Sequence, residues 1–185
     1  MTGRRSSRPQ VLAVLCLAAG LASCRIDRSP RRVPDDGAPC SAIMPGAPTT
    51  GETTFRLDSV VVAERAWGLR PPEFSIDPPK DITRYIVRRA TVPTGTTLRD
   101  AALLDAAAAR VTKDIEAGSG EKPTVEKVAT TAGGAVDLRY TTGALHSATR
   151  LLLIPGGFCE VTIMGAFTEA EVASFLASAQ VHARP

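Results

Sequence analysis

Cysteine and histidine, the side chains best suited to thiol catalysis and to binding a transition metal, are few in this 185-residue chain. They are four cysteines and two histidines, Cys16, Cys24, Cys40, Cys159, His146 and His182. None of the CxxC, HxxxH or HExxH spacings that typify metal sites occurs, and the acidic residues are scattered along the chain. We therefore predict no metal site and no cofactor.

Cys159 and His146 are the strongest candidates for thiol catalysis, because both lie near one predicted hairpin. A turn at Pro155-Gly156 would place Cys159 opposite Leu152 and leave His146 about six residues further along. At about 3.3 Å per residue this is roughly 20 Å, beyond hydrogen-bond reach. We predict no catalytic residues and expect a protein that is not an enzyme.

Three other polar or aromatic features could have either a functional or a purely structural role. Glu160 and Asp137 on neighbouring strands could form a carboxylate pair, but solvent-facing strand charges are the commoner explanation. Trp67 could contact a ligand or a partner protein, although such a residue more often holds a loop over the core. His182 lies near the C-terminus and is expected to be solvated.

The N-terminal residues have the layout of an export signal. Arg4, Arg5 and Arg8 precede an uncharged apolar run from Val11 to Leu21. This run is too short to cross a hydrocarbon core, which needs about 20 apolar residues. We predict a signal over residues 1–23.

The segment Leu21-Ala22-Ser23-Cys24 resembles the bacterial lipobox, which matches it at every position. The resemblance implies cleavage before Cys24, diacylglyceryl on its sulfur and a further acyl chain such as palmitate on the new amino group. Two or more chains would give a stable membrane anchor. The protein would then be a lipoprotein of the cell envelope, on the outer membrane facing the periplasm or on the outer face of the cell membrane. The alternative is an ordinary secretory signal.

The signal also accounts for the net charge of the chain. Three of the 22 basic residues lie within residues 1–23 and none of the 19 acidic ones does, so the remaining chain is balanced. It therefore lacks the basic footprint of a nucleic-acid-binding protein.

Cys40 and Cys159 are the pair left after cleavage and lipidation. In an oxidising compartment such a pair is first interpreted as a disulfide. The alternative is a buried free Cys159, which alternates with the apolar Val161 and Ile163, and an exposed Cys40.

Composition predicts a flexible tether over residues 24–54, which are rich in Pro, Arg, Gly and Thr and poor in apolar residues.

A single folded domain is expected over 55–185. Its first strands are predicted at 55–62 and 85–92. Thr97 and Asp100 have the form of a capping box. The apolar spacing after it predicts a helix that ends near Gly118.

Four strands are expected next, over residues 124–130, 135–141, 148–154 and 158–166. A full capping box from Thr168 to Glu171 begins a short closing helix. Strands grouped around and between two helices indicate an α+β fold with an antiparallel sheet. The element order resembles the PsbP/Mog1-like fold, which small bacterial lipoproteins also use.

The sequence thus favours a membrane-anchored, non-enzymatic binding or accessory domain with a protein partner in the envelope. The alternative is a carrier that holds an apolar small molecule between the sheet and the Ala-rich helix.

Overall fold

The computed structural model describes residues 29–34, 37–57, 60–69, 83–96, 99–130, 134–143 and 145–182. The predicted signal, the lipidation candidate Cys24 and the candidate N-cap Thr97 lie outside these ranges. Within them, no helix is long and apolar enough to cross a membrane.

Seven strands form one antiparallel sheet, in the order β3-β4-β5-β9-β8-β7-β6. Two meanders, β3 to β5 and β6 to β9, meet where β9 pairs with β5. The fold is therefore α+β, as the sequence predicts. The strands are β3 Thr49–Leu57, β4 Val60–Leu69, β5 Arg84–Thr91, β6 Thr124–Val128, β7 Ala135–Thr142, β8 Leu145–Ile154 and β9 Gly157–Met164.

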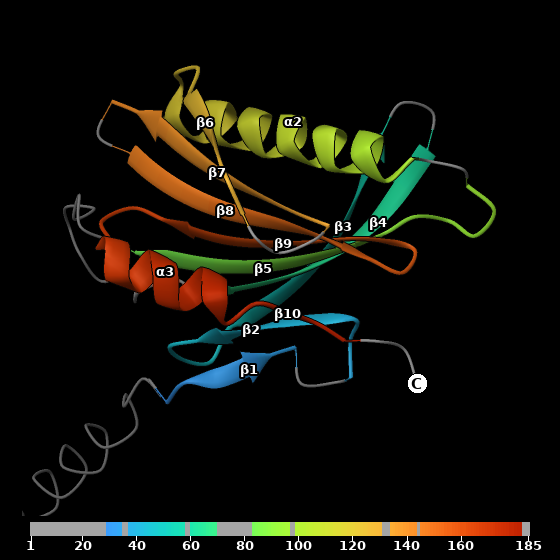
Figure 1. Ribbon diagram of the computed structural model, residues 1–185, viewed down its shortest axis with the longest axis horizontal. Coiled ribbons are helices and arrows are strands. Elements are labelled where there is room, and N and C mark those ends of the chain that lie inside the picture. Colours follow the sequence, from blue (N-terminus) through green and yellow to red (C-terminus); the bar gives the residue numbers. More distant parts are fainter. Residues whose placement is uncertain are drawn as a thin grey trace, which may run out of the picture.

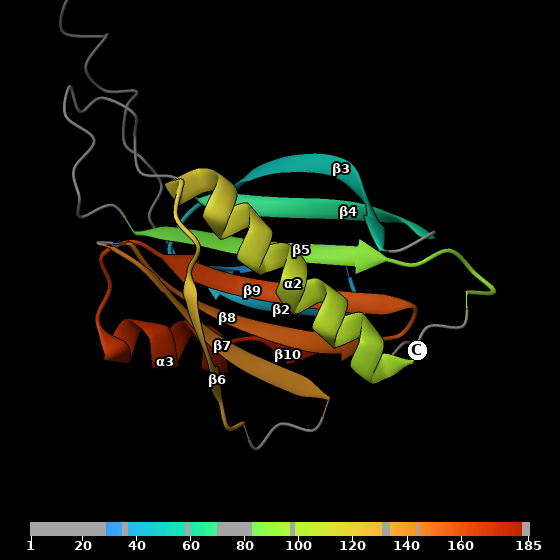
Figure 2. The same cartoon turned by 90° about the horizontal axis from the view of Figure 1, so that it is seen from above.

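Helix α2, Asp100–Ser119, connects the two meanders and crosses one face of the main sheet diagonally (Figure 2). It is rich in alanine, the residue with the highest helix propensity. Gly120 ends the helix in the left-handed conformation, with φ of 74°. Its buried residues are Leu103, Leu104, Ala107, Val111 and Ile115, each of the large ones contributing about 1.5–3 kcal/mol by burial.

The predicted capping box at the start of α2 is wrong. The helix begins at Asp100, and its N-cap is Arg99, which makes no side-chain cap hydrogen bond. The helix predicted from the apolar spacing is confirmed. Of the positions that predicted its apolar face, Leu104, Val111 and Ile115 are buried, whereas Ala101 is exposed.

A second layer covers the opposite face of the main sheet (Figure 1). It contains helix α3, Glu169–Ala177, and a small antiparallel sheet of order β1-β2-β10. Strand β2 is central, so segments from near the two ends of the described chain lie side by side. The strands are β1 Arg31–Val33, β2 Cys40–Met44 and β10 Gln180–Val181.

The second layer corrects the predicted tether over residues 24–54. Strands β1 and β2 and most of β3 lie within that range. Cys40, Ala42 and Met44 are each 0 % exposed and pack into the core against the main sheet. The composition of residues 24–54 suggested a tether because the segment has few apolar residues. A few buried apolar side chains are nevertheless enough to order a short strand when a disulfide also links that strand to the main sheet.

The single strand predicted over 55–62 is also wrong, because this stretch contains a reversal of the chain. Leu57 pairs with Val60 at the end of the β3–β4 hairpin, whose strands extend from Thr49 to Leu69. Asp58 and Ser59, both common turn residues, stand between them in the sequence. The β-branched residues on either side concealed this turn signal.

The predictions for the second half of the chain are largely confirmed. Strands β5 to β9 lie within three residues of their predicted bounds. The capping box of α3 is present: Thr168 Oγ1 accepts from the Glu171 backbone N–H, and the Glu171 carboxylate accepts from the Thr168 backbone N–H. The Thr168 backbone N–H, and then the Thr168 hydroxyl, which donates to the same carboxylate at 2.9 Å, lower the pKa of Glu171.

We expect Thr168→Ala to lower the free energy of unfolding by roughly 1 kcal/mol, because a helix N–H loses its cap. Thr168→Ser, which keeps the hydroxyl, should remain close to wild type. Since the folded-state pKa of Glu171 is lowered, the stabilisation by its carboxylate is present above its unfolded-state pKa and is lost as the pH falls. Urea unfolding at neutral and acidic pH measures both effects, and equal stability of the two variants would contradict the assignment.

Candidate functional site

The disulfide between Cys40 on β2 and Cys159 on β9 joins the two sheets. Both cysteines are 0 % exposed, and they are 119 positions apart in a chain segment that includes most of the main sheet. Of the two sequence-based readings, the disulfide is therefore confirmed. Cys159 faces the core as predicted, but its sulfur is bonded and is not a free thiol.

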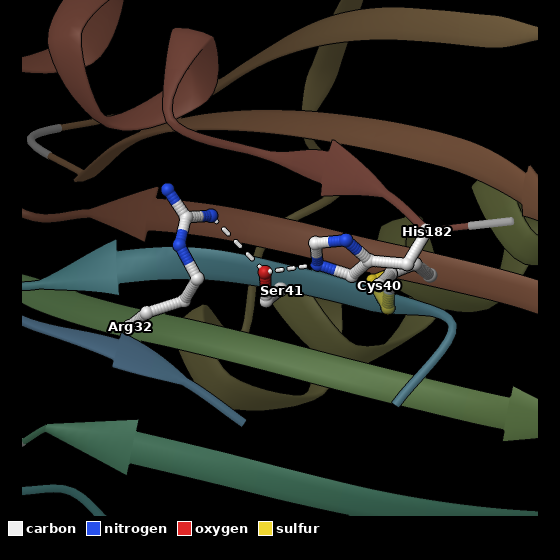
Figure 3. The surroundings of a disulfide bond; sticks show 5 residues. Arg32, Cys40, Ser41 and His182 are labelled. Carbon is white, nitrogen blue, oxygen red and sulfur yellow. Dashed lines mark hydrogen bonds between the residues drawn. A yellow bond between two sulfur atoms is a disulfide. The ribbon is translucent and has the colours of Figure 1, made fainter. Parts of the chain in front are cut away.

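A polar cluster, formed by Arg32, Ser41 and His182, lies next to the disulfide on the outer side of β2 (Figure 3). Ser41 Oγ accepts from the Arg32 guanidinium at 3.0 Å and lies 2.8 Å from His182 Nε2. Arg32 also donates to the Ser178 carbonyl at 3.2 Å. This cluster was not anticipated, because its residues come from both ends of the chain.

His182 is therefore not the freely solvated tail residue expected from the sequence. Its backbone N–H donates to the Pro39 carbonyl at 2.8 Å, which extends the pairing of β10 with β2. A serine beside a histidine could be a nucleophile and its base. Ser41, however, is 1 % exposed, and its oxygen is enclosed by Arg32 and His182. This geometry fits a structural role, in which the polar cluster attaches the segment at His182 to strand β2.

Trp67 lies in the core and does not offer the contact surface proposed from the sequence. It is 5 % exposed on β4 and packs in the same apolar cluster as the disulfide. The Arg65 guanidinium lies 5.4 Å from the centre of its ring, a cation–π contact. Trp67 thus holds strand β4 against the second layer.

His146 and Cys159 are not brought together. Cys159 lies opposite Leu152, as the predicted register requires. His146 is exposed near the start of β8, and its carbonyl accepts from the Gly165 backbone N–H at 2.9 Å. Among the residues that the structure describes, no three His, Cys, Asp or Glu side chains are grouped to hold a metal ion.

Glu160 and Asp137 lie on opposite faces of the sheet and form no carboxylate pair. Asp137 accepts two hydrogen bonds from Arg150 on β8, at 2.8 and 2.7 Å. Glu160 faces α2 and is 1 % exposed, so the expectation of a solvent-facing charge is wrong for it. Its charge is compensated by Arg88, directly opposite on β5.

A buried network of charges connects Glu160 to helix α2. Arg88 donates to both Glu160 carboxylate oxygens, at 3.1 and 3.2 Å, and to Asp114 of α2 at 3.1 Å. The negative charge of Glu160 raises the pKa of Arg88, which keeps the guanidinium protonated. Arg110 of α2 in turn binds Glu64 of β4, which is 4 % exposed.

Uncharged polar side chains continue this network across the sheet. Thr162 donates to Glu160 at 2.9 Å, and Thr149 lies 2.8 Å from Thr162. Tyr140, further along under the same helix, is 1 % exposed, and burial raises its pKa to about 12. The helix is therefore fixed to the sheet by a polar row as well as by apolar contacts.

Two hollows on the surface of the described residues are bordered by strand residues, and neither lies between α2 and the sheet. One, of about 570 Å³, is bordered by Arg65, Arg89 and other residues of β3, β4 and β5. The other, of about 360 Å³, is bordered mainly by residues of β7 and β8 and by the segment before α3. Polar and charged side chains dominate both linings, which suits polar contacts better than an apolar ligand.

Comparisons of the chain with known protein families, curated proteins and solved structures give no match.

Removing the disulfide should destabilise the fold strongly. For a loop of this length the chain-entropy relation gives roughly 5 kcal/mol for replacing both cysteines by alanine. Unfolding in urea with and without a reducing agent measures the effect. Reduction should lower the midpoint of wild type but not that of the double variant, and an unchanged wild-type midpoint would contradict a stabilising role.

Glu160→Gln should cost roughly 3 kcal/mol, because it leaves the buried Arg88 guanidinium without its main counter-charge. Asp114→Asn is the matched control, since Asp114 binds the same arginine but its side chain is 43 % exposed; it should cost at most about 1 kcal/mol. The double variant Arg88→Met, Glu160→Leu should recover most of the loss. Equal effects of the two single variants would show that burial is not the cause.

Proposed function

We propose that the protein is a lipid-anchored lipoprotein of the bacterial cell envelope, whose folded part is a non-enzymatic binding or accessory domain. The observation that carries the proposal is the disulfide between Cys40 and Cys159, because stable disulfides are typical of proteins outside the reducing cytoplasm. It supports the export signal and the lipobox resemblance at Cys24, which are independent of it.

The position of the first strand sets how far the domain can reach from its anchor. Strand β1 begins at Arg31, seven residues after Cys24. A fully extended chain spans at most about 3.6 Å per residue, so this connection is limited to roughly 25 Å. The folded domain would therefore work close to the bilayer surface, and a partner would be another component of that surface.

Surface binding is favoured over the alternative of a carrier for an apolar small molecule. The space between α2 and the main sheet, where such a molecule was expected, is occupied by the apolar residues of the helix and by the Arg88 and Arg110 ion pairs. A ligand there would have to separate buried charges. We also retain the PsbP/Mog1-like element order as part of the proposal, since strands, one long helix, four strands and a second helix follow one another before the short strand β10.

Metabolic labelling with a clickable fatty acid tests the anchor. Wild type should carry the label and sediment with membranes, whereas Cys24→Ala should be unlabelled. Cys16→Ala is the matched control, because this cysteine lies in the same signal but outside the lipobox, and it should be labelled like wild type. Label on the Cys24→Ala variant, or none on wild type, would reject the lipoprotein assignment.

A further inference from the structure

The two edges of the main sheet differ in how far they are protected from pairing. Edge strand β6 has five residues, contains Lys127 and directly follows Pro123. Short length, lysine and proline are the devices by which proteins block further strand addition. Edge strand β3 also directly follows a proline, Pro48, but it has nine residues and contains no lysine. It is therefore the longer and less protected of the two edges.

The outer side of β3 is open among the residues that the structure describes. Strand β4 pairs with it on one side along its whole length, and no described strand pairs with the other (Figure 2). All residues from Thr49 to Thr54 are exposed. Backbone N–H and C=O groups at such an edge are free to extend the sheet.

The charges on β3 indicate which kind of strand could pair with it. Glu52 and Arg56 are both exposed and lie four residues apart, with Thr54 midway between them. Because side chains alternate along a strand, all three point to the same face of the sheet. Glu52 also forms an ion pair with Arg65 of β4 at 3.6 Å, but its side chain remains 76 % exposed, and such an exposed pair contributes little. Opposite charges across a strand pair stabilise it, and like charges destabilise it.

Two copies of β3 satisfy this rule in one antiparallel register. If Thr54 lies opposite Thr54 of a second chain, Glu52 of each copy lies opposite Arg56 of the other. Thr53 then lies opposite Phe55 of the partner copy, and residues 51–57 form the paired region. A parallel, in-register pairing would instead place Glu52 opposite Glu52 and Arg56 opposite Arg56.

We propose that β3 is a homodimerisation edge, at which a second copy of this chain adds antiparallel about Thr54 and makes two symmetric Glu52–Arg56 pairs. The two seven-stranded sheets become one continuous sheet. The contact is isologous, as in most symmetric dimers, and it closes on itself, so it does not propagate into fibres.

A single introduced cysteine tests the register. Directly opposite residues in antiparallel strands have Cα atoms about 4.5–5.5 Å apart, within the range of a disulfide. We expect Thr54→Cys to form a cross-linked dimer on mild oxidation. The matched control is Thr50→Cys on the same strand and face, whose two copies would be about 27 Å apart at about 3.4 Å per residue. The background is the full chain with Cys16→Ala and Cys24→Ala, so the result does not depend on a lipid anchor.

Exchanging the charges at Glu52 and Arg56 tests whether these residues pair between the two copies. Arg56→Glu added to the Thr54→Cys chain should reduce cross-linking roughly tenfold, because both symmetric pairs become like-charged. Adding Glu52→Arg to it should restore cross-linking, because the exchanged charges are again complementary. Thr124→Cys on β6, the other edge, should not cross-link.

Equal cross-linking of the Thr54→Cys and Thr50→Cys chains would reject the register, and failure of both would reject the dimer. Loss of cross-linking in the Arg56→Glu chain that the charge exchange does not repair would reject the charge pairing. A monomeric protein that still carries lipid on Cys24 would overturn this inference and leave the proposed anchor intact.

Discussion

The pairing of β5 with β9 holds the molecule together. These strands are far apart in the sequence, and their eight paired residues join the two meanders into one sheet. The register places Arg88 opposite Glu160 and Arg89 opposite Cys159. A shift of one residue would turn Glu160 toward the apolar second layer and the disulfide cysteine toward the helix. One strand pair thus determines where the buried charge and the covalent link both lie.

The two faces of the main sheet are attached to their covering layers by different interactions. On one face, helix α2 is held by apolar side chains and by buried arginine–carboxylate pairs, which are directional and lose their benefit when one partner is removed. On the other face, the small sheet and α3 are held by an apolar cluster that includes Trp67, and by the disulfide. The arginine–carboxylate pairs thus fix helix α2 in one position on its face of the sheet. On the other face, the disulfide stabilises a layer whose three strands are short.

The sequence predicted the elements whose signals are local. The α3 capping box, the Pro155-Gly156 turn and the alternation along β7 to β9 each depend on neighbouring residues, and the Leu152–Cys159 register followed from the turn. Long-range partners were not predictable in this way. Glu160 gives no local indication that Arg88 covers it, and Ser41 gives none that it meets His182. A β2 strand beside prolines resembled a tether, because its burial depends on residues more than a hundred positions away.

The small sheet also imposes an order on folding. Its central strand β2 comes early in the chain, whereas β10, which pairs with it, is contributed by the last described residues. A chain that emerges from a ribosome or a translocation channel with its N-terminus first must therefore release Cys40 long before either Cys159 or β10 is available. During that interval the cysteine is an unpaired thiol on an unfolded segment, open to wrong disulfides with other chains. Native closure of this layer is thus a late event, and contacts of such long sequence separation form slowly. The early segment therefore keeps an unpaired cysteine until β9 and β10 have followed it.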